Sequence, residues 1–347
     1  MGNTGETGTT RRWLRFALLA AFCWVGGVGQ ACSQENPLDQ VQTPAPVKPV
    51  KPAAQAPGSR SPEDDRLTKL PRLRAEADLV LVPMTVTDPM NRLVTGLEAA
   101  NFQVFDNNMG QVIKTFSTED APVSIGIVFD LSGSMGTKFV RARKALSEFL
   151  RTSNPADEFF VVGFNDRPAV IVDYTSDPDD VDARMVMLRP ENRTALIDAV
   201  YLGVNKLKQA KYERKALLVI SDGGDNRSRY TQGELRRIVR ESDVEIYSIG
   251  IFDTYAPTPE EVQGPMLLSD ISEMSGGRLF RVDDVSEMSD IAERISAELR
   301  NQYVVGYRPS EMKKDGKWRK LKVRLVPPPG LPPLTVHFRQ GYYAPSQ

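Results

Sequence analysis

Hydrophobic and polar positions change their period along the chain. Between residues 123 and 302, short apolar runs alternate with segments whose apolar residues recur every three to four positions. The runs predict strands at 124–130, 158–164, 169–173, 215–221, 244–251 and 278–282. The periodic segments predict helices at 138–151, 195–210, 232–242, 266–274 and 285–301. Strands that alternate with helices predict an α/β fold, with a doubly wound, mostly parallel sheet covered by helices on both faces.

The segments on either side of this region are rich in alternating apolar and polar residues, which predicts strands instead. They lie at 79–87, 102–106 and 111–116 before the α/β region, and at 303–307, 320–326 and 334–338 after it. Each set is small, and short strands struggle to bury a face alone. We therefore expect an N-terminal β unit at 74–120 and C-terminal strands at 303–347 to pack together as one β-sandwich-like unit around a domain at 123–302.

The first 32 residues have the layout of a signal peptide. Arg11 and Arg12 precede an apolar run at 16–28, and small residues follow it. The run is short for a membrane-spanning helix, so an uncleaved anchor is the less favoured alternative. The paired arginines loosely resemble a twin-arginine signal, although an ordinary secretory signal is favoured. Lipidation of Cys32 is a further alternative, because the preceding residues only partly match the required pattern. The protein is thus expected to be exported, to the periplasm, the cell surface or the medium.

Composition narrows the choice of partner and compartment. Residues 33–70 are rich in proline, alanine and lysine and predict a disordered, extended linker. Across 347 residues, the net charge of −1 gives no reason to expect nucleic acid as a partner. Cys23 and Cys32 are the only cysteines, and both lie in the signal segment, so no internal disulfide is expected in the mature protein.

Hard oxygen ligands gather where the first predicted strand of the α/β region ends. That strand runs directly into Asp130, Ser132 and Ser134, a D-x-S-x-S pattern. In a doubly wound sheet the carboxyl ends of the strands face one crevice, which should also receive Thr194, before a predicted helix, and Asp222, after a predicted strand. A lone D-x-S-x-S is also typical of a strand-end turn. The five residues together predict a site for a magnesium-class ion, which prefers oxygen ligands.

These five positions, in their elements, resemble a von Willebrand factor type A (VWA) domain with an intact metal-ion-dependent adhesion site. The resemblance covers about 123–302, and the flanking segments resemble a bacterial exported group of such proteins. It implies that Ser132, Ser134 and Thr194 bind Mg²⁺ (or Mn²⁺ or Ca²⁺) through hydroxyls, with Asp130 and Asp222 direct or through water. The partner would be a protein that offers Asp or Glu to the metal. One departure is Asn192, where many relatives have glycine.

Two other functions stay open beside cation-dependent protein binding. One is a structural or assembly scaffold in the envelope that uses the VWA fold without a metal-bridged ligand. The other, less favoured, is a magnesium-dependent phosphate hydrolase, because Asp130, Thr194, Lys215 and Asp222 superficially resemble aspartyl-phosphate phosphatases. Such enzymes need an acid two residues after the nucleophile, and Ser132 stands there. We therefore expect a binding protein with no catalytic residues and no small-molecule substrate.

Three further features receive ordinary structural interpretations. His337 is the only histidine and lies in a predicted strand, which excludes a histidine-based catalytic triad or zinc site. The acidic residues at 177–182 indicate the start of a solvated helix rather than a calcium loop. The segment 253–264 contains proline and acidic residues and is expected to form a loop, which could line the rim of the binding site.

Overall fold

A computed structural model of the protein describes residues 79–252, 259–282, 284, 287–311 and 313–346. The predicted signal segment with Cys23 and Cys32, the predicted linker at 33–70 and the first half of the predicted loop, 253–258, lie outside the described residues. The second half of that loop, 259–264, is helical, so the loop prediction is wrong there. In the described ranges, no helix is both long and apolar enough to cross a membrane.

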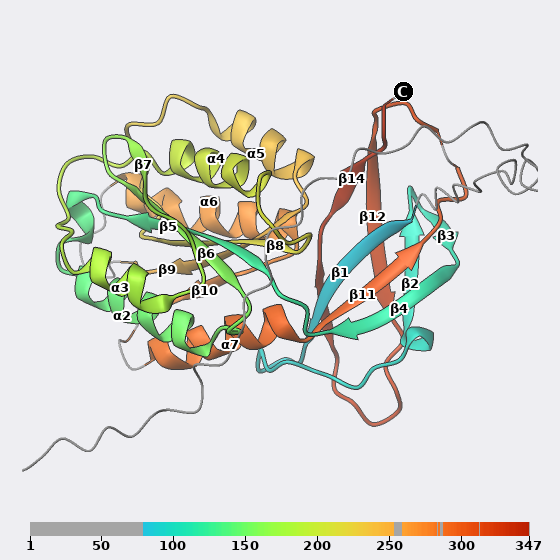
Figure 1. Cartoon of the computed structure of the whole chain (residues 1–347). Helices are drawn as coiled ribbons and strands as arrows, with labels where there is room; N and C mark the ends of the chain where they lie inside the picture. Colours follow the sequence, from blue (N-terminus) through green and yellow to red (C-terminus); the bar gives the residue numbers. More distant parts are fainter. Residues whose placement is uncertain (1–78, 253–258, 283, 285–286, 312, 347) are drawn as a thin grey trace, which may run out of the picture. The chain divides into compact units, whose positions relative to one another are not determined.

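A six-stranded sheet forms the centre of the α/β region (Figure 1), and its strand order is β10-β9-β8-β5-β6-β7. The strands are β5 (Ser124–Asp130), β6 (Glu158–Phe164), β7 (Pro168–Thr175), β8 (Lys215–Ser221), β9 (Val244–Gly250) and β10 (Leu279–Arg281). All neighbours pair in parallel except β6 and β7, which are antiparallel. This mostly parallel sheet confirms the predicted fold class.

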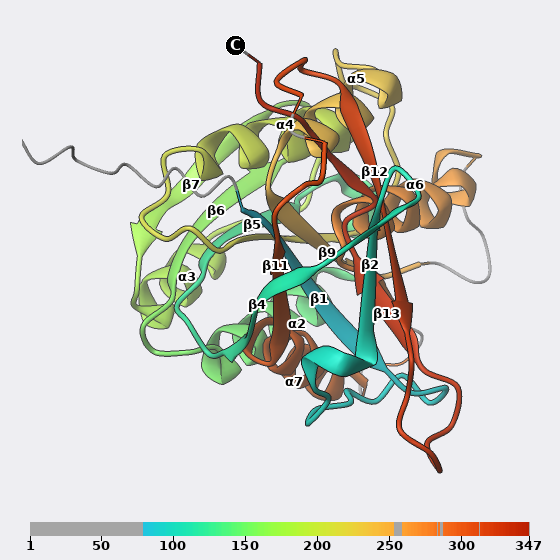
Figure 2. The ribbon, with the colours of Figure 1, turned by 90° about the vertical axis from the view of Figure 1, so that its right-hand side faces the viewer.

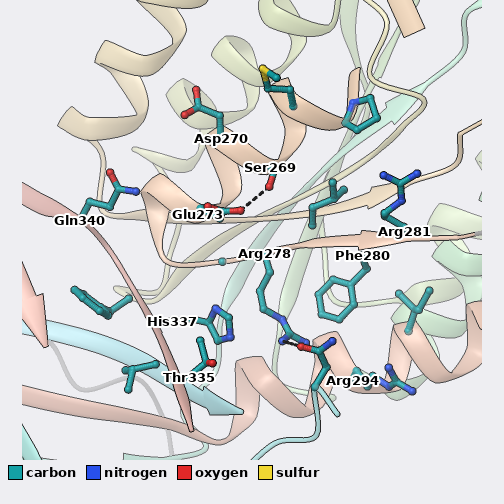
Figure 3. A pocket seen from close by; sticks show the side chains of 18 of the residues that line it. Ser269, Asp270, Glu273, Arg278, Phe280, Arg281, Arg294, Thr335, His337 and Gln340 are labelled. Carbon is teal, nitrogen blue, oxygen red and sulfur yellow. Dashed lines mark hydrogen bonds between the residues drawn. The ribbon is translucent and has the colours of Figure 1, made fainter. Parts of the chain in front are cut away.

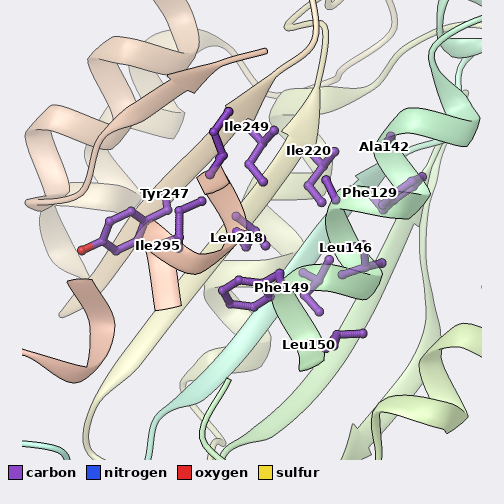
Figure 4. Close-up of a cluster of buried hydrophobic side chains, with 14 of the residues drawn as sticks. Phe129, Ala142, Leu146, Phe149, Leu150, Leu218, Ile220, Tyr247, Ile249 and Ile295 are labelled. Atoms are coloured by element: carbon purple, nitrogen blue, oxygen red, sulfur yellow. The ribbon is translucent and has the colours of Figure 1, made fainter. Parts of the chain in front are cut away.

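Helices cover both faces of this sheet. The cluster on one face involves α2 (Phe139–Thr152), α3 (Pro178–Met185) and α7 (Met288–Arg300), and the cluster on the other involves α4 (Leu196–Leu207), α5 (Gln232–Glu241) and α6 (Pro259–Ser275). Strand side chains alternate between the two: Ile127 and Phe129 enter the first cluster, which Figure 4 shows, and Val128 enters the second. The apolar run of β5 is therefore buried on both sides, as parallel strands require.

Two helices differ from the sequence pattern in an informative way. α6 begins at Pro259, seven residues before the predicted start, and continues through Pro265. Pro265 is the reason that the sequence pattern did not predict the first turns of α6, because proline inside a periodic segment usually marks a helix boundary. The acidic residues at 177–182 do begin a helix, α3, whose first turn is capped when Asp179 N–H donates to Asp177 Oδ1 at 2.9 Å.

Strands from the two ends of the described chain share two antiparallel sheets, with strand orders β13-β1-β11-β4 and β14-β12-β2-β3. The strands are β1 (Val80–Thr87), β2 (Phe102–Asp106), β3 (Met109–Gln111), β4 (Ile113–Glu119), β11 (Gln302–Tyr307), β12 (Trp318–Leu325), β13 (Thr335–Phe338) and β14 (Gly341–Tyr343), and a 3-10 turn, η1 (Ala99–Asn101), precedes β2. A shared core that includes Val82, Phe102 and Tyr303 lies between them. Figure 2 shows these strands beside the α/β region.

The six-stranded sheet has two edge strands, β7 and β10, and Figure 3 shows the region beside β10. β10 has three residues, follows Arg278 and ends with Arg281, and a short, charged edge strand discourages further strand pairing. A groove of about 1440 Å³ runs beside it, lined by α6, α7 and β13 as well. Arg278 is held within the fold by an ion pair with Glu298 at 2.6 Å, so the edge is short, charged and anchored.

The titration of His337 can be measured without interference from other histidines, because it is the only histidine in the chain. Its Nε2 lies 3.0 Å from Thr87 Oγ1, and burial, with a smaller effect of Arg278, lowers the pKa of His337 to about 4. Since the pKa falls below its unfolded value of 6.5, the neutral ring stabilises the fold above pH 6.5, and this contribution is lost as the pH falls toward 4. We expect NMR titration of the single ring to give a midpoint near 4, and a midpoint near 6.5 would contradict the burial.

Candidate functional site

The candidate ligands lie at the carboxyl edge of the parallel sheet, where β5 and β8 end side by side. In the register of these strands Phe129 pairs with Ile220, so Asp130 and Ser221 are the next residues on neighbouring strands. Asp222 follows Ser221, and Ser132 and Ser134 follow Asp130. Parallel pairing thus brings two segments that are far apart in sequence to one edge.

The first loop folds its own polar groups together. Ser132 N–H donates to Asp130 Oδ1 at 2.9 Å, and the hydroxyls of Ser132 and Ser134 are 3.0 Å apart. A short 3-10 turn, η2 (Gly133–Met135), follows Ser132 and sets this spacing. Asp130 and Ser132 are fully buried, whereas Ser134 is exposed. The hydroxyl pair therefore extends from the buried carboxylate toward solvent.

The loop after β8 is tied to the first loop through Ser221. Ser221 Oγ donates to Asp130 Oδ2 at 2.5 Å and accepts a hydrogen bond from Gly223 N–H at 2.9 Å. Gly223 has φ of +80°, and a Cβ atom there would lie 2.5 Å from Gly264 Cα, so the turn needs glycine. Asp222 is fully buried, and its Oδ1 accepts Gly224 N–H at 3.2 Å.

The loop that carries Thr194 is bonded to both of the others. Gly133 N–H donates to the Asn192 carbonyl at 3.0 Å, and the N–H groups of Asn226 and Arg227 each donate to the Thr194 carbonyl at 3.0 Å. Thr194 N–H in turn donates to Asn226 Oδ1 at 3.1 Å. Asn192, the departure noted in the sequence, has φ of +69°, a left-handed conformation that asparagine tolerates better than most residues. The backbone there is the one that glycine would also adopt.

Charge at this edge is concentrated and buried. Burial, followed by the neighbouring charge of Asp222, raises the pKa of Asp130, while hydrogen bonds from Ser132 and Ser221 oppose the shift. Lys138, just before α2, donates from Nζ to Asp222 Oδ2 at 3.2 Å, and its side chain is 7% exposed. A lysine ammonium thus occupies a position where the two carboxylates call for positive charge.

The donor set fits a hard divalent cation. Asp130 and Asp222 supply carboxylates, and Ser132, Ser134 and Thr194 supply hydroxyls, which are ligands that Mg²⁺, Mn²⁺ and Ca²⁺ accept. The described ranges contain no group of three or more His, Cys, Asp or Glu side chains that could hold a metal ion, so a metal at this edge would depend on the hydroxyls as well as on the two carboxylates. Direct hydrogen bonds join Asp130 to Ser132 and Ser132 to Ser134, whereas Thr194 and Asp222 are connected to them through their loops and Ser221.

Sequence reasoning missed two residues of this edge, Lys138 and Ser221. Lys138 was expected only as the first residue of a helix, and Ser221 only as the end of a strand. The signal for Lys138 is its place four residues after Ser134, because a helix that starts there turns its first side chains back toward the strand end. No local pattern marks Ser221 as a donor to Asp130, since the two are 91 residues apart.

Lys215, the lysine that suggested phosphatase chemistry, does not lie at the edge of the sheet that carries Asp130. Lys215 is the first residue of β8 and pairs with Ser124, at the opposite end of the strands from Asp130. Six residue steps of a parallel strand span about 20 Å. Lys215 therefore cannot complete a phosphatase site with Asp130.

Comparison with known proteins agrees with this fold. Residues 125–224 match the family model of the von Willebrand factor type A domain. A relative from Borreliella burgdorferi, an uncharacterized protein, is 24% identical over 187 residues, which are 47% of this chain and 55% of that protein. The chain thus spans about half the length of this curated relative.

Two solved structures illustrate the structural similarity. A von Willebrand factor type A protein from Catenulispora acidiphila has 13% identity and a TM-score of 0.45, over 69% of this chain and 72% of that one. The vWF domain of the type V pili tip protein Mfa5 from Porphyromonas gingivalis has 12% identity and a TM-score of 0.42, over 53% of this chain and 98% of that one. The segment 125–224, which contains all five candidate ligands, is therefore similar to the von Willebrand factor type A domain family.

Proposed function

We propose that this protein binds a divalent cation, Mg²⁺ or alternatively Mn²⁺ or Ca²⁺, at the carboxyl edge of its parallel sheet and uses it to bind a protein partner. Asp130, Ser132, Ser134, Thr194 and Asp222 would hold the ion. The observation that carries the proposal is the pair of fully buried carboxylates, Asp130 and Asp222, beside the hydroxyl pair of Ser132 and Ser134.

The mix of ligands favours an ion that stays available to a partner. Hydroxyls are neutral, so a site with two carboxylates and three hydroxyls compensates an ion less completely than a cage of acidic side chains. Ser134 is exposed, which leaves one side of the site open to solvent. When bound, the ion supplies a coordination position that an Asp or Glu carboxylate of a partner can occupy. The protein's own contribution is to hold the ligands and to leave that side open.

Binding is favoured over catalysis by the residues around Asp130. An aspartyl-phosphate mechanism needs a second carboxylic acid two residues later, and Ser132 cannot protonate a leaving group in that way. Lys138, the lysine at this edge, is paired with Asp222. We therefore assign no catalytic residue.

The cellular setting follows from the N-terminal segments and is part of the same proposal. A signal peptide at 1–32 would export the protein to the periplasm, the cell surface or the medium, and a linker at 33–70 would separate the domain from any anchor. An adhesion or assembly role is compatible with that setting. A scaffold that uses the fold without a metal-bridged ligand is the alternative.

Calorimetric titration of Mg²⁺ and Mn²⁺ into the purified chain tests the metal site. We expect one cation per chain, and Ser132→Ala should weaken its binding at least tenfold, about 1.4 kcal/mol, because a buried hydroxyl ligand is lost. Ser346→Ala, at an exposed serine remote from the sheet edge, is the matched control and should bind as the original chain does. Absence of binding to the original chain would refute the proposal and leave the scaffold alternative.

A further inference from the structure

Four exposed arginines lie on loops at the same sheet edge as the candidate metal site, and we call them the arginine rim: Arg167, Arg193, Arg227 and Arg229. Arg167 follows β6, Arg193 precedes α4, and Arg227 and Arg229 follow β8. All four therefore lie on loops at the carboxyl edge of the parallel sheet. Among the described residues, none of their guanidinium groups forms an ion pair. Their charges are therefore available to a partner.

Backbone hydrogen bonds hold two members of the rim next to Thr194. Arg193 precedes Thr194 in the chain, and its N–H donates to Asp166 Oδ1 at 3.1 Å. Arg227 N–H donates to the Thr194 carbonyl at 3.0 Å. These bonds hold the backbone of both arginines beside Thr194.

Hydrogen bonds also position the loops that carry the other two members of the rim, Arg229 and Arg167. Arg229 N–H donates to Asp198 Oδ1 at 2.8 Å, which fixes the loop after β8 against the first turn of α4. Arg167 follows Asp166, the residue that accepts the Arg193 N–H. The carboxylates of Asp166 and Asp198 are thus engaged with backbone N–H groups of the rim. Among the described residues of these loops, Glu191 is the acid with an exposed side chain, so exposed arginines outnumber exposed acids there.

Exposed apolar side chains accompany the rim. Tyr230, next to Arg229, is 40% exposed and stacks on Tyr201 with ring centroids 4.0 Å apart. Met187, in the segment that leads to Asn192, is 81% exposed. Arginine, tyrosine and methionine are the residues enriched in protein interfaces, and large exposed apolar side chains around a polar centre are typical of binding surfaces.

We propose that the partner presents an acidic segment, several Asp or Glu residues close together in sequence, to this edge. One carboxylate would reach the cation, and its neighbours would pair with the arginine rim. This inference rests on the proposed function and adds to it the class of partner. Guanidinium groups pair with carboxylates through two parallel hydrogen bonds, and a positive rim accelerates the encounter with an acidic segment. An isolated acidic residue in a neutral or basic segment would use the cation alone.

A fluorescently labelled hexaglutamate peptide tests the inference in fluorescence anisotropy, with a hexapeptide of glutamine that carries one glutamate as comparison. We expect the original chain with Mg²⁺ to bind hexaglutamate at least tenfold more tightly than the comparison peptide. The double reversal Arg193→Glu with Arg227→Glu should remove this preference and still bind Mn²⁺ in calorimetry, because the arginines are not ligands. The matched control is Lys322→Glu with Arg324→Glu, the same change of charge at exposed positions of β12, and it should keep the preference.

Each of the remaining outcomes contradicts either the acidic-segment inference or the proposed function. The acidic-segment inference is overturned, with the metal site left intact, if the original chain binds the two peptides equally. The same conclusion follows if it binds Mn²⁺ but not hexaglutamate. Equal weakening by both double reversals also overturns it, because net charge alone would then explain the preference. Failure of Mn²⁺ to bind the original chain refutes the proposed function instead.

Discussion

Replacing Lys138 with methionine is expected to lower the free energy of unfolding of the metal-free protein by about 3 kcal/mol. The Lys138 ammonium lies 3.2 Å from Asp222 Oδ2, and the two side chains are 7% and 0% exposed. Removing one partner of a buried ion pair leaves the other charge in a poorly solvated place, which is the costly case. Methionine keeps the length and the apolar stem of lysine, so the loss reports on the charge.

The same variant is informative when a divalent cation is present. An ion held by Asp130 and Asp222 replaces the missing positive charge, so the loss in Lys138→Met should shrink in Mg²⁺, and the variant should bind Mg²⁺ more tightly than the original chain. Urea denaturation with a chelator and with excess Mg²⁺ measures both effects. Lys144→Met, at an exposed position of the same helix, is the control and should change stability by less than about 0.5 kcal/mol. An equal loss with and without Mg²⁺ would contradict this account.

Phe149→Ala is expected to cost about 4 kcal/mol of stability, the second large effect. Phe149 on α2 is completely buried and belongs to the cluster between the sheet and α2 and α7. In Figure 4 it lies among Leu146, Leu218 and Ile295, side chains from three different elements. Truncation removes the buried ring and leaves a cavity that strands and helices on several sides cannot close.

Denaturant unfolding followed by circular dichroism measures this loss. Val140→Ala lies on the same helix at a position that is 69% exposed, so the matched change there should be within about 0.5 kcal/mol of the original. A small loss for Phe149→Ala would mean that α2 does not pack against the sheet as described. Binding of Mg²⁺ by Phe149→Ala should persist while the variant is folded, since Phe149 is no candidate ligand.

The central sheet could be predicted from the chain because its signals are local. The predicted limits of three strands, β5, β6 and β8, agree with the structure to the residue, since each is a continuous apolar run bounded by polar or turn residues. α6 was predicted too short because Pro265, inside the helix, breaks the local pattern, whereas packing of the helix on β9 and β10 does not depend on that one missing N–H group.

The residues of the candidate site likewise include some that local sequence signals reveal and some that they do not. Asp130, Ser132 and Ser134 could be found together because they are neighbours in sequence, and Thr194 and Asp222 could be added from the rule that strand ends converge. Lys138 and Ser221 could not be found, because their roles depend on which atoms face each other across the sheet edge. Metal binding by the five residues stays a prediction, for which the buried carboxylates and the Lys138 ammonium give physical support.

The sequence by itself determined the α/β class, the order of the strands and helices along the chain, and the types of ligand at the strand ends, since periodicity and turn chemistry act over a few residues. Only the tertiary structure decided that Ser221 donates to Asp130 across 91 residues, that Lys138 pairs with Asp222, and that the exposed Arg227 lies beside Thr194. Those contacts depend on parallel pairing of β5 with β8 and on backbone bonds between loops. Such pairing is set by the packing of the whole sheet, which no local segment of the chain encodes.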